Sequence, residues 1–211
     1  MSQSNQELSF STPTRELENE RRTWLIACGA AGGVATAAVA VPLVSSMMPA
    51  ERARSAGAPV EVDIADIPVG GMKTVEWRGK PVWIVRRTPE MLASLEKVEG
   101  QLADAKSDRT AFPTPDYAKN RHRSIKPEVF VAVGICTHLG CSPVNKFETG
   151  NVPGLGSDWQ GGYFCPCHGS NFDHAGRVYA NKPAPDNLEI PRHMYLSDTR
   201  IIVGKDEKGE A

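Results

Sequence analysis

The first pattern along the chain is a long uncharged stretch near its N-terminus. No charged residue occurs from Thr23 to Ala50, and the segment Trp24–Val44 holds only apolar and small residues apart from Thr36. As a helix with a rise of 1.5 Å per residue, this segment would be about 31 Å long, close to the roughly 30 Å hydrocarbon core of a bilayer. A core helix of a soluble protein usually keeps a polar stripe, and this segment has none. The pattern therefore predicts a single transmembrane helix.

After this segment the apolar positions follow the period of strands. Val60 to Ile64 alternate between apolar and acidic side chains, which is typical of a half-buried strand. Two further runs, Thr74–Trp77 and Val82–Val85, flank the polar sequence Arg78-Gly79-Lys80. A glycine-containing turn between two such runs predicts a β-hairpin.

One helical pattern interrupts the strands. Thr88 is a favourable N-cap, and Pro89 suits the first helical position. Apolar side chains then recur at helical spacing, at Met91, Leu92, Leu95, Val98 and Leu102. We expect one amphipathic helix from about Pro89 to Lys106.

The rest of the chain reads as short strands. Val129–Ile135 is a continuous apolar run and predicts a buried strand. The later apolar runs are separated by Gly, Pro, Asn and Asp: Tyr163–Phe164, Val178–Tyr179, Leu188–Ile190 and Ile201–Val203. The predicted fold class is one N-terminal transmembrane helix followed by an all-β antiparallel domain with one inserted helix.

These patterns divide the chain into four segments. Residues 1–23 precede the transmembrane segment 24–44. Residues 45–59 are small and polar without an apolar period, which predicts a flexible linker. Residues 60–211 then form the globular domain.

The charge balance excludes one class of function. With 24 Lys and Arg against 25 Asp and Glu, the formal net charge is −1. That balance argues against a nucleic-acid-binding protein. Hydrophobic residues make up 40% of the chain, which is enough for a globular core and too much for a disordered chain.

Arg21 and Arg22 directly precede the apolar segment, and the sequence Thr23-Trp24-Leu25-Ile26 follows them. The pair resembles a twin-arginine export signal, although the positive-inside rule also places such cations on the cytoplasmic side. Acidic residues in the first 23 positions argue against a mitochondrial transit peptide. We expect a single-pass protein of the bacterial inner membrane, with its N-terminus in the cytoplasm and its globular domain in the periplasm. Ala38-Val39-Ala40 leaves open whether the span is cleaved as a signal or kept as an anchor.

The candidate chemistry lies in two short loops. The first is Cys136-Thr137-His138-Leu139-Gly140-Cys141, and the second is Cys165-Pro166-Cys167-His168-Gly169-Ser170. Each loop offers a thiolate and an imidazole at close spacing, a set that can bind zinc or an iron-sulfur cluster. Each loop also carries one Cys more than a four-ligand zinc site needs, and in an oxidising compartment the surplus pair would cross-link the loops. Gly140 and Gly169 allow tight turns that aim backbone N–H groups at anionic sulfur.

The sequences CTHLGC and CPCHGS resemble the paired motifs of the Rieske [2Fe-2S] proteins of quinol:cytochrome c oxidoreductases, the cytochrome bc complexes. The resemblance extends to the arginine pair, to the order of strands and helix, and to Lys182-Pro183-Ala184-Pro185, which is similar to that family's proline loop. It covers the chain from Arg21 to about Pro191 and implies a small cluster-binding subdomain at about 134–185.

The resemblance implies one [2Fe-2S] cluster of the Rieske type. Cys136 and Cys165 would hold the buried iron, and His138 and His168 would hold the outer iron. Because two neutral imidazoles replace two thiolates, an added electron is repelled less, and Rieske potentials lie roughly 250 to 700 mV above the plant-type ferredoxin value. Such a site is suited to accept an electron from a quinol.

The same resemblance implies roles for residues next to the ligands. Cys141 and Cys167 would form the family's disulfide, and Leu139 would shield the cluster at the docking surface. The Ser170 hydroxyl would donate to a cluster sulfur, while Pro183-Ala184-Pro185 would form the proline loop.

The function implied is that of the iron-sulfur subunit of a quinol:cytochrome c reductase. The subunit would take one electron from ubiquinol at cytochrome b, with a proton passing to His168, and give the electron to a c-type cytochrome. Its partners would be those cytochromes, ubiquinol and the membrane, within a homodimeric complex and without nucleic acid. One alternative is the Rieske subunit of a periplasmic oxidase such as arsenite oxidase, and another is a zinc-stabilised interaction module.

Two positions depart from the family's pattern. Phe172 stands where many respiratory relatives have a Tyr whose hydroxyl bonds the sulfur of a ligating Cys. Without that hydrogen bond the reduced cluster is less stabilised, so we expect a lower potential. Lys182 stands where mitochondrial relatives tend to have Gly.

The other histidines and the fifth cysteine show no ligand pattern. We expect His122, His174 and His193 at the surface, and Cys28 as a small residue within the transmembrane span.

Overall fold

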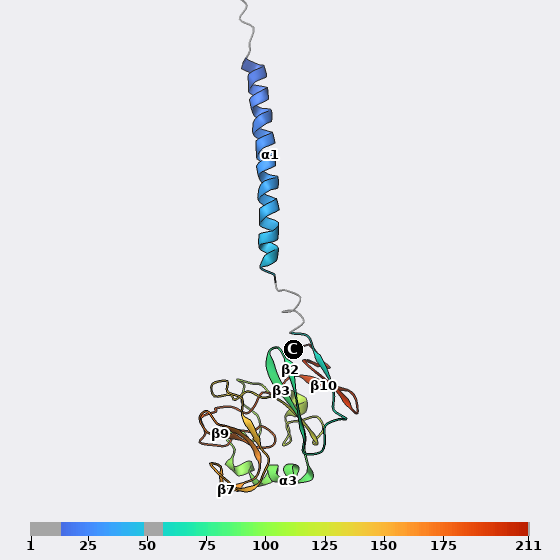
Figure 1. Cartoon of the computed structure of the whole chain (residues 1–211), viewed down its shortest axis with the longest axis vertical. Helices are drawn as coiled ribbons and strands as arrows, with labels where there is room; N and C mark the ends of the chain where they lie inside the picture. The colour runs from blue at the N-terminus through green and yellow to red at the C-terminus, as the bar shows by residue number, and fades with distance from the viewer. Residues whose placement is uncertain (1–13, 49–56, 211) are drawn as a thin grey trace, which may run out of the picture. The chain divides into compact units, whose positions relative to one another are not determined.

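The computed structural model describes residues 14–48 and 57–210. The chain divides into an N-terminal unit and a globular unit, and each is described by itself (Figure 1). The first 13 residues, and residues 49–56 of the expected linker, lie outside the described residues.

The N-terminal unit is one long helix, α1 (Thr14–Ser46). Its portion Leu17–Ser46 is long and apolar enough to cross a membrane, and that portion is unburied within the protein. The helix is longer than the segment 24–44 because it continues through Arg21 and Arg22, which are good helix formers. By length and composition this helix fits a membrane-spanning segment.

The globular unit is centred on an antiparallel sheet in the order β2-β3-β4, formed by β2 (Met72–Trp77), β3 (Lys80–Arg86) and β4 (Val129–Val133). The predicted hairpin is confirmed, with Trp77 paired to Lys80 across a two-residue turn. Arg78 and Gly79 both have positive φ, 52° and 71°, as the tightest hairpin turns require. Strand β4 ends before Gly134, where a Cβ would overlap the indole of Trp83.

A second antiparallel sheet has the order β1-β11-β10, with β1 (Val60–Asp63), β10 (His193–Ser197) and β11 (Arg200–Val203). A short ribbon of β12 (Lys205–Asp206) and β13 (Gly209–Glu210) follows it. We call the apolar cluster between the β2-β3-β4 and β1-β11-β10 sheets the base core. It consists of Val62, Ile64, Ile67, Trp77, Val82, Ile84, Val131, Val133, Ile201 and Val203.

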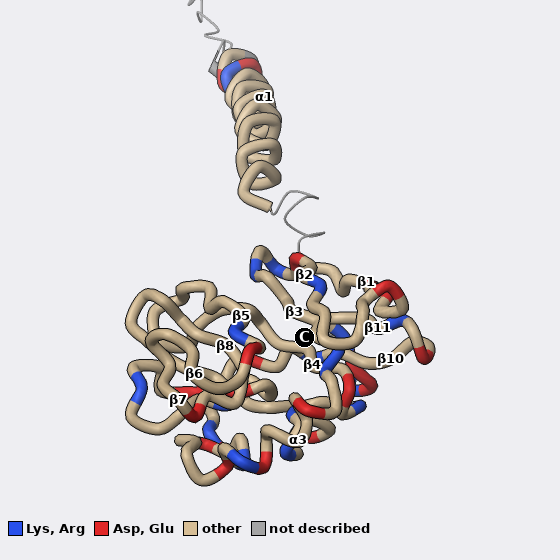
Figure 2. The backbone as a smooth tube through the Cα atoms, turned by 60° about the horizontal axis from the view of Figure 1, so that its bottom comes forward, with Lys and Arg blue, Asp and Glu red and all other residues tan. Residues whose placement is uncertain are grey.

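A smaller lobe holds the remaining strands. β5 (Val144–Lys146), β8 (Gly162–Cys165) and β9 (Ser170–Phe172) form a sheet in the order β5-β8-β9. β6 (Gly150–Val152) pairs with β7 (Gly156–Trp159). Figure 2 shows this lobe on the side of β3 and β4 away from β1, β10 and β11.

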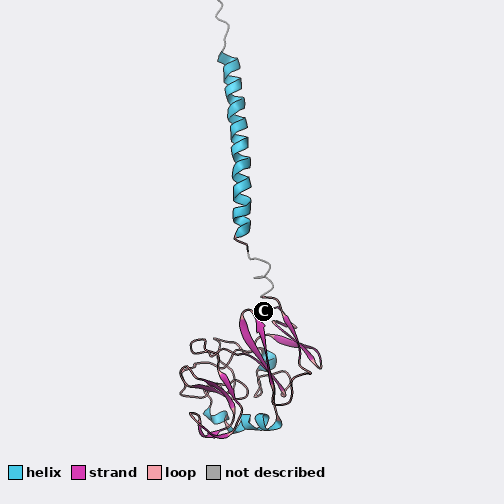
Figure 3. Cartoon of the chain, in the orientation of Figure 1, coloured by secondary structure: helices cyan, strands magenta, loops and turns pink. Residues whose placement is uncertain are grey.

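The apolar cluster between this lobe and the central sheet is the site core. It consists of Trp83, Val85, Ala118, Phe130, Ala132, Cys136, Tyr163, Cys165, Phe172, Val178, Ala184, Leu188 and Ile190. On β3, Val82 and Ile84 face the base core while Trp83 and Val85 face the site core. Both faces of the strand are buried, which explains its continuous apolar sequence. The expected all-β antiparallel domain with an inserted helix is confirmed (Figure 3).

The inserted helix α3 (Pro89–Lys97) is shorter than the expected Pro89 to Lys106. Its start is as predicted, because Thr88 Oγ1 accepts a hydrogen bond from the Met91 N–H at 3.3 Å. The chain then forms the 3-10 turns η1 (Glu99–Gln101) and, later, η2 (Asp116–Ala118). Leu102 is extended and pairs with Tyr179, so tertiary pairing ends the helix early.

Two other expectations are wrong. His174 and His193 are buried, at 1% and 2% exposure, rather than at the surface. The His174 ring packs on Phe147, and His193 Nδ1 lies 2.8 Å from the Pro191 carbonyl oxygen. Val178–Tyr179 and Leu188–Ile190 are not strands either; both runs lie in loops, and Val178–Tyr179 forms only single β-bridges.

Candidate metal centre

The two cysteine loops are closed by tight turns at the ends of strands. The Cys136 N–H donates to the Cys141 carbonyl at 2.7 Å, and the Gly140 N–H donates back to the Cys136 carbonyl at 3.1 Å. In the second loop the Gly169 N–H donates to the Cys165 carbonyl at 2.9 Å. Gly140 and Gly169 have φ of 82° and 78°, the left-handed region that glycine adopts without strain. Cys165 ends β8, and its pairing with Ser170 on β9 holds the second loop in place.

The four loop cysteines fall into two kinds. Cys141 and Cys167 form a disulfide that joins the two loops, with their Cα atoms 6.7 Å apart. Cys136 and Cys165 are free thiols, each 2% exposed. Both thiols belong to the site core, and the neighbouring Cys165 and Ser170 side chains influence the pKa of Cys136. Burial raises the pKa of the Cys136 thiol, so a bound cation would be needed to hold it as a thiolate.

The two loop histidines lie together at the outer end of the site. The rings of His138 and His168 are 4.7 Å apart between centroids and meet edge to face. His138 is half-buried, and its Nδ1 atom is buried without a hydrogen-bond partner among the described residues. His168 is exposed. The two thiols thus lie in the protein interior, and the two imidazoles lie closer to its surface.

This donor set fits a [2Fe-2S] cluster of the Rieske type, which takes two thiolates on one iron and two imidazoles on the other. The partnerless Nδ1 of His138 is the kind of buried atom that a metal would satisfy. The sulfurs of Cys141, Cys165 and Cys167 also lie within 4.8 Å of one another. That group of three cannot bind a metal, because two of its sulfurs are already bonded to each other.

The expected proline loop contacts both cysteine loops. The Ala184 N–H donates to Ser170 Oγ at 2.9 Å, which leaves the Ser170 hydroxyl proton for a sulfur acceptor. The Thr137 hydroxyl donates to the Asp186 carbonyl at 2.6 Å. Pro183 and Pro185, on either side of the buried Ala184, are exposed.

Two further residues to which the sequence assigned a role near the cluster differ sharply in their exposed fraction. Leu139 is 71% exposed on the first loop, the largest exposed fraction among the exposed large apolar side chains of the described globular unit. Phe172 on β9 is fully buried in the site core and carries no hydroxyl.

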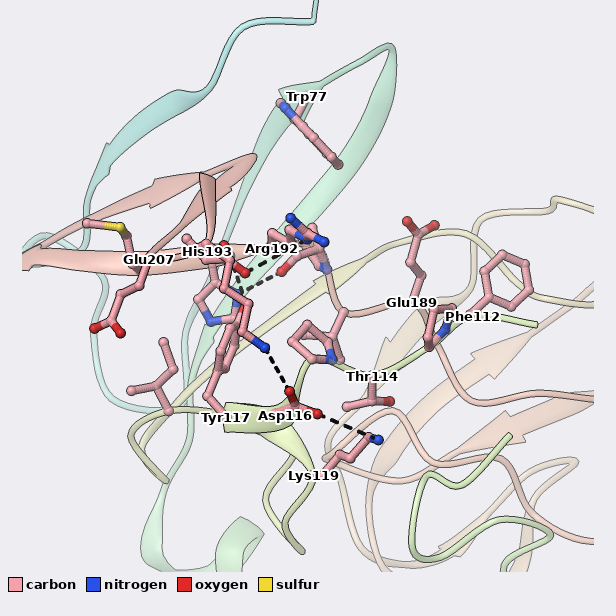
Figure 4. A pocket seen from close by; sticks show the side chains of 18 of the residues that line it. Trp77, Phe112, Thr114, Asp116, Tyr117, Lys119, Glu189, Arg192, His193 and Glu207 are labelled. Atoms are coloured by element: carbon pink, nitrogen blue, oxygen red, sulfur yellow. Dashed lines mark hydrogen bonds and ion pairs between the residues drawn. The ribbon is translucent and has the colours of Figure 1, made fainter. Parts of the chain in front are cut away.

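A cavity of about 800 Å³ lies apart from this site (Figure 4). Trp77, Phe112 and Tyr117 line it, and among its lining residues none belongs to a cysteine loop. Several of its charged side chains pair with one another, as where Lys208 Nζ lies 2.9 Å from Asp116 Oδ2. The candidate chemistry is therefore on the loop surface and not in this cavity.

Sequence reasoning missed a set of buried charges behind the site. Arg123 lies in a segment that reads as polar surface, yet it is 1% exposed. Asp173 and Arg177 form a buried ion pair at 2.7 Å. Their spacing of four residues, next to the second cysteine loop, was the one available signal.

Comparisons with known proteins agree with this geometry. Residues 59–193 match the family model described as Rieske [2Fe-2S] domain. Residues 12–50 match the model described as ubiquitinol-cytochrome C reductase Fe-S subunit TAT signal, which bears out the expected twin-arginine signal.

Individual relatives carry related names. The ubiquinol-cytochrome c reductase iron-sulfur subunit of Allochromatium vinosum is 54% identical, over 88% of this chain and 88% of its own length. The protein of the same name from Bradyrhizobium diazoefficiens is 39% identical, over 87% of this chain and 94% of its own. The cytochrome b-c1 complex subunit Rieske-1, mitochondrial, of Nicotiana tabacum is 40% identical, over 70% of this chain and 48% of its own.

These matches count against a zinc module and against the subunit of a periplasmic oxidase. A Rieske [2Fe-2S] domain spans the two cysteine loops, and the bacterial relatives are subunits of one oxidoreductase complex. The chain therefore belongs to the family of Rieske [2Fe-2S] iron-sulfur subunits of ubiquinol-cytochrome c reductase.

Proposed function

We propose that the protein collects one electron from ubiquinol at cytochrome b and passes it to a c-type cytochrome. The observation that carries this proposal is the pair of imidazoles at the outer end of the site. His138 and His168 lie against each other there, next to the exposed side chain of Leu139. A redox centre that reacts with a large membrane partner needs such an accessible end.

The ligand assignment follows the two ends of the site. Cys136 and Cys165 would hold one iron, and His138 and His168 would hold the other. When bound, the cluster supplies a one-electron acceptor whose potential is high because imidazoles replace two thiolates.

His168 is the residue proposed to contact the quinol. Each ligating imidazole keeps one ring nitrogen that does not bind iron, and His168 is the more exposed of the two. That nitrogen accepts a hydrogen bond from the quinol hydroxyl and takes its proton as the electron leaves. Electron and proton transfer from the quinol are then coupled at one side chain.

The surrounding residues position this contact. The Cys141–Cys167 disulfide clamps the two loops together, so that both imidazoles keep their orientation. Leu139 and the exposed Pro183 and Pro185 present an apolar face for docking on cytochrome b and exclude water there.

The membrane arrangement is the one expected from the sequence. Arg21 and Arg22 direct export, the span 24–44 stays as an anchor in the bacterial inner membrane, and the N-terminus remains in the cytoplasm. The domain 60–211, with its cluster-binding subdomain at about 134–185, lies in the periplasm. The linker 45–59 lets this domain move between cytochrome b and the c-type cytochrome within a homodimeric complex.

The test uses the complex purified from membranes with the full chain. We expect b-type and c-type haem spectra to co-purify with the protein. Leu139→Glu should keep the cluster's EPR signal and lose most ubiquinol-dependent cytochrome c reduction, because a charge disrupts an apolar contact. Leu196→Glu is the matched control, since Leu196 is 44% exposed on β10. Wild-type turnover in Leu139→Glu, or a preparation without b-type haem, would overturn the proposal.

A further inference from the structure

Three guanidinium groups are buried behind the cysteine loops. Among the described residues, Arg87, Arg123 and Arg177 are each no more than 2% exposed. The one carboxylate buried with them is Asp173, at 1% exposure. Three positive charges against one negative charge leave a net charge of about +2 in this set, a rare arrangement because unpaired buried charges are costly.

The contacts show which charge is paired. Arg177 Nε and Nη2 both lie 2.7 Å from Asp173 Oδ2. Arg87 instead donates to backbone carbonyls of His122, Pro127 and His174 and to the Ser124 hydroxyl.

Arg123 is held in the same way as Arg87. It donates to the carbonyls of Ala175, Gly176 and Leu188 and to the Thr114 hydroxyl. Carbonyl dipoles replace the lost hydration of these two arginines without cancelling their charge.

The neighbouring titratable groups do not neutralise the set. Burial lowers the pKa of Arg87 and of Arg123 to about 10, so both remain cationic at neutral pH. Burial also lowers the pKa of His174 to about 4, which leaves that ring neutral. Outside the set, Glu128 acts on the charge of Arg87 and Asp104 on that of Arg123; Glu128 is exposed and Asp104 is half-buried, so solvent screens both.

The set lies at the end of β9 opposite the candidate cluster site, where Arg87 Nη1 is 3.1 Å from the carbonyl oxygen of His174, the residue after Asp173. Strand β9 runs from Ser170, paired with Cys165, to Phe172, and Asp173 is the next residue. At about 3.3 Å per residue, Asp173 is about 10 Å from the Ser170 end of the strand. The intervening Phe172 and Tyr163 are fully buried, so this path excludes water.

We propose that Arg87 and Arg123, together with the Asp173–Arg177 pair, set the midpoint potential of the cluster through their net positive charge. Reduction adds one negative charge to the cluster, and an unscreened positive charge stabilises that product. With an effective dielectric constant of about 20 and a separation of about 12 Å, one charge changes the ratio of reduced to oxidised cluster about tenfold. The inference rests on the cluster assignment and does not depend on ubiquinol as the electron donor.

The experiment is a redox titration of the complex from membranes, followed by EPR and visible circular dichroism. Arg87→Gln should lower the reduced-to-oxidised ratio at a fixed potential about tenfold, a downward shift of about 59 mV for one electron. Arg87→Lys keeps the charge and should shift the potential much less. Arg86→Gln is the surface control, because Arg86 is the exposed neighbour on β3, and it should leave the potential nearly unchanged.

Asp173→Asn supplies an independent test with the opposite sign. It removes the one buried negative charge while keeping an oxygen that can accept from the Ala175 and Arg177 N–H groups. The potential should rise, an outcome that loosened packing alone does not predict. If Arg87→Gln does not fold, Arg123→Gln takes its place. Equal shifts in Arg87→Gln and Arg87→Lys, or a lowered potential in Asp173→Asn, would overturn the inference, whatever the quinol turnover.

Discussion

The two cores on either face of the central sheet are built in different ways. The base core is formed by aliphatic side chains and one tryptophan from regular strands and the segment after β1. The site core includes two free thiols and the Tyr163 ring, and buried arginines lie behind it. One face of β3 thus serves a conventional apolar core, while the other carries loops whose positions depend on a disulfide and on individual hydrogen bonds.

The two cores therefore have different roles. Burial of apolar area in the base core stabilises the fold without requiring any particular polar contact. The site core must hold thiols, imidazoles and charges at fixed positions, and each of them needs a specific partner. Substitutions in the base core should therefore change stability and leave the redox properties intact, whereas substitutions in the site core should change the redox properties as well.

The largest expected effect is the complete loss of the cluster in His168→Gln. An amide cannot replace an imidazole as an iron ligand, so EPR of the reduced protein should show no Rieske signal and turnover should vanish. His174→Gln is the control, because His174 is a buried histidine of the same lobe outside the two loops. A His168→Gln protein with an intact signal and wild-type turnover would refute the ligand assignment.

A large stability effect is expected from the base core. Ile84 is fully buried there, and Ile84→Ala should lower the free energy of unfolding by about 2–5 kcal/mol. Ile202→Ala, at a half-buried position of β11, should lower it less. Urea unfolding of the full chain in detergent measures both. The comparison between the cores fails if Ile84→Ala also shifts the midpoint potential.

Removal of the disulfide should lower the stability of the smaller lobe, which holds the cysteine loops, more than that of the rest of the domain. Replacing both Cys141 and Cys167 by Ser removes a cross-link worth about 2–4 kcal/mol. We expect the visible absorption of the cluster to bleach at a lower urea concentration than the one that unfolds the strands, measured by circular dichroism. Cys28→Ser, in α1, is the control and should leave both transitions in place. Coincident transitions in the double variant would show that the two cores unfold as one.

The smallest expected effect is a modest rise in potential in Phe172→Tyr. The added hydroxyl would supply a hydrogen bond to a ligand sulfur and stabilise the more negative, reduced cluster. Phe147→Tyr is the matched control, because Phe147 packs on Tyr163 and lies outside the cysteine loops. An unchanged midpoint in Phe172→Tyr would make Phe172 a packing residue without influence on the potential.

The same contrast explains which features could be predicted from the sequence. The β2–β3 hairpin was predictable because its strand period and its Arg78-Gly79 turn are local signals. The end of α3 was not, because Leu102 leaves the helical pattern to pair with Tyr179, far along the chain. The burial of Arg123 could not be predicted for the same reason, since its hydrogen-bond acceptors include the Leu188 carbonyl, 65 residues away.

The candidate site itself was visible in the sequence as two motifs with fixed spacing. The metal-binding chemistry of the two motifs follows from their residue types, which can be read directly from the sequence. Their arrangement was not visible, because the contact between the His138 and His168 rings and the support from the Ala184 N–H depend on segments distant in the sequence. Long-range contacts therefore separate what was predicted from what was missed.

The most direct test of the central claim is a rapid-mixing experiment on the oxidised complex. Ubiquinol is added, and the EPR signal of the cluster and the absorbance of the c-type haem are followed together. The account predicts that the signal of the reduced cluster appears no later than c-type haem reduction. In Leu139→Glu, whose chemically reduced cluster keeps its EPR signal, ubiquinol should reduce neither the cluster nor the c-type haem at the wild-type rate. Reduction of the c-type haem at the wild-type rate while the cluster stays oxidised would contradict it.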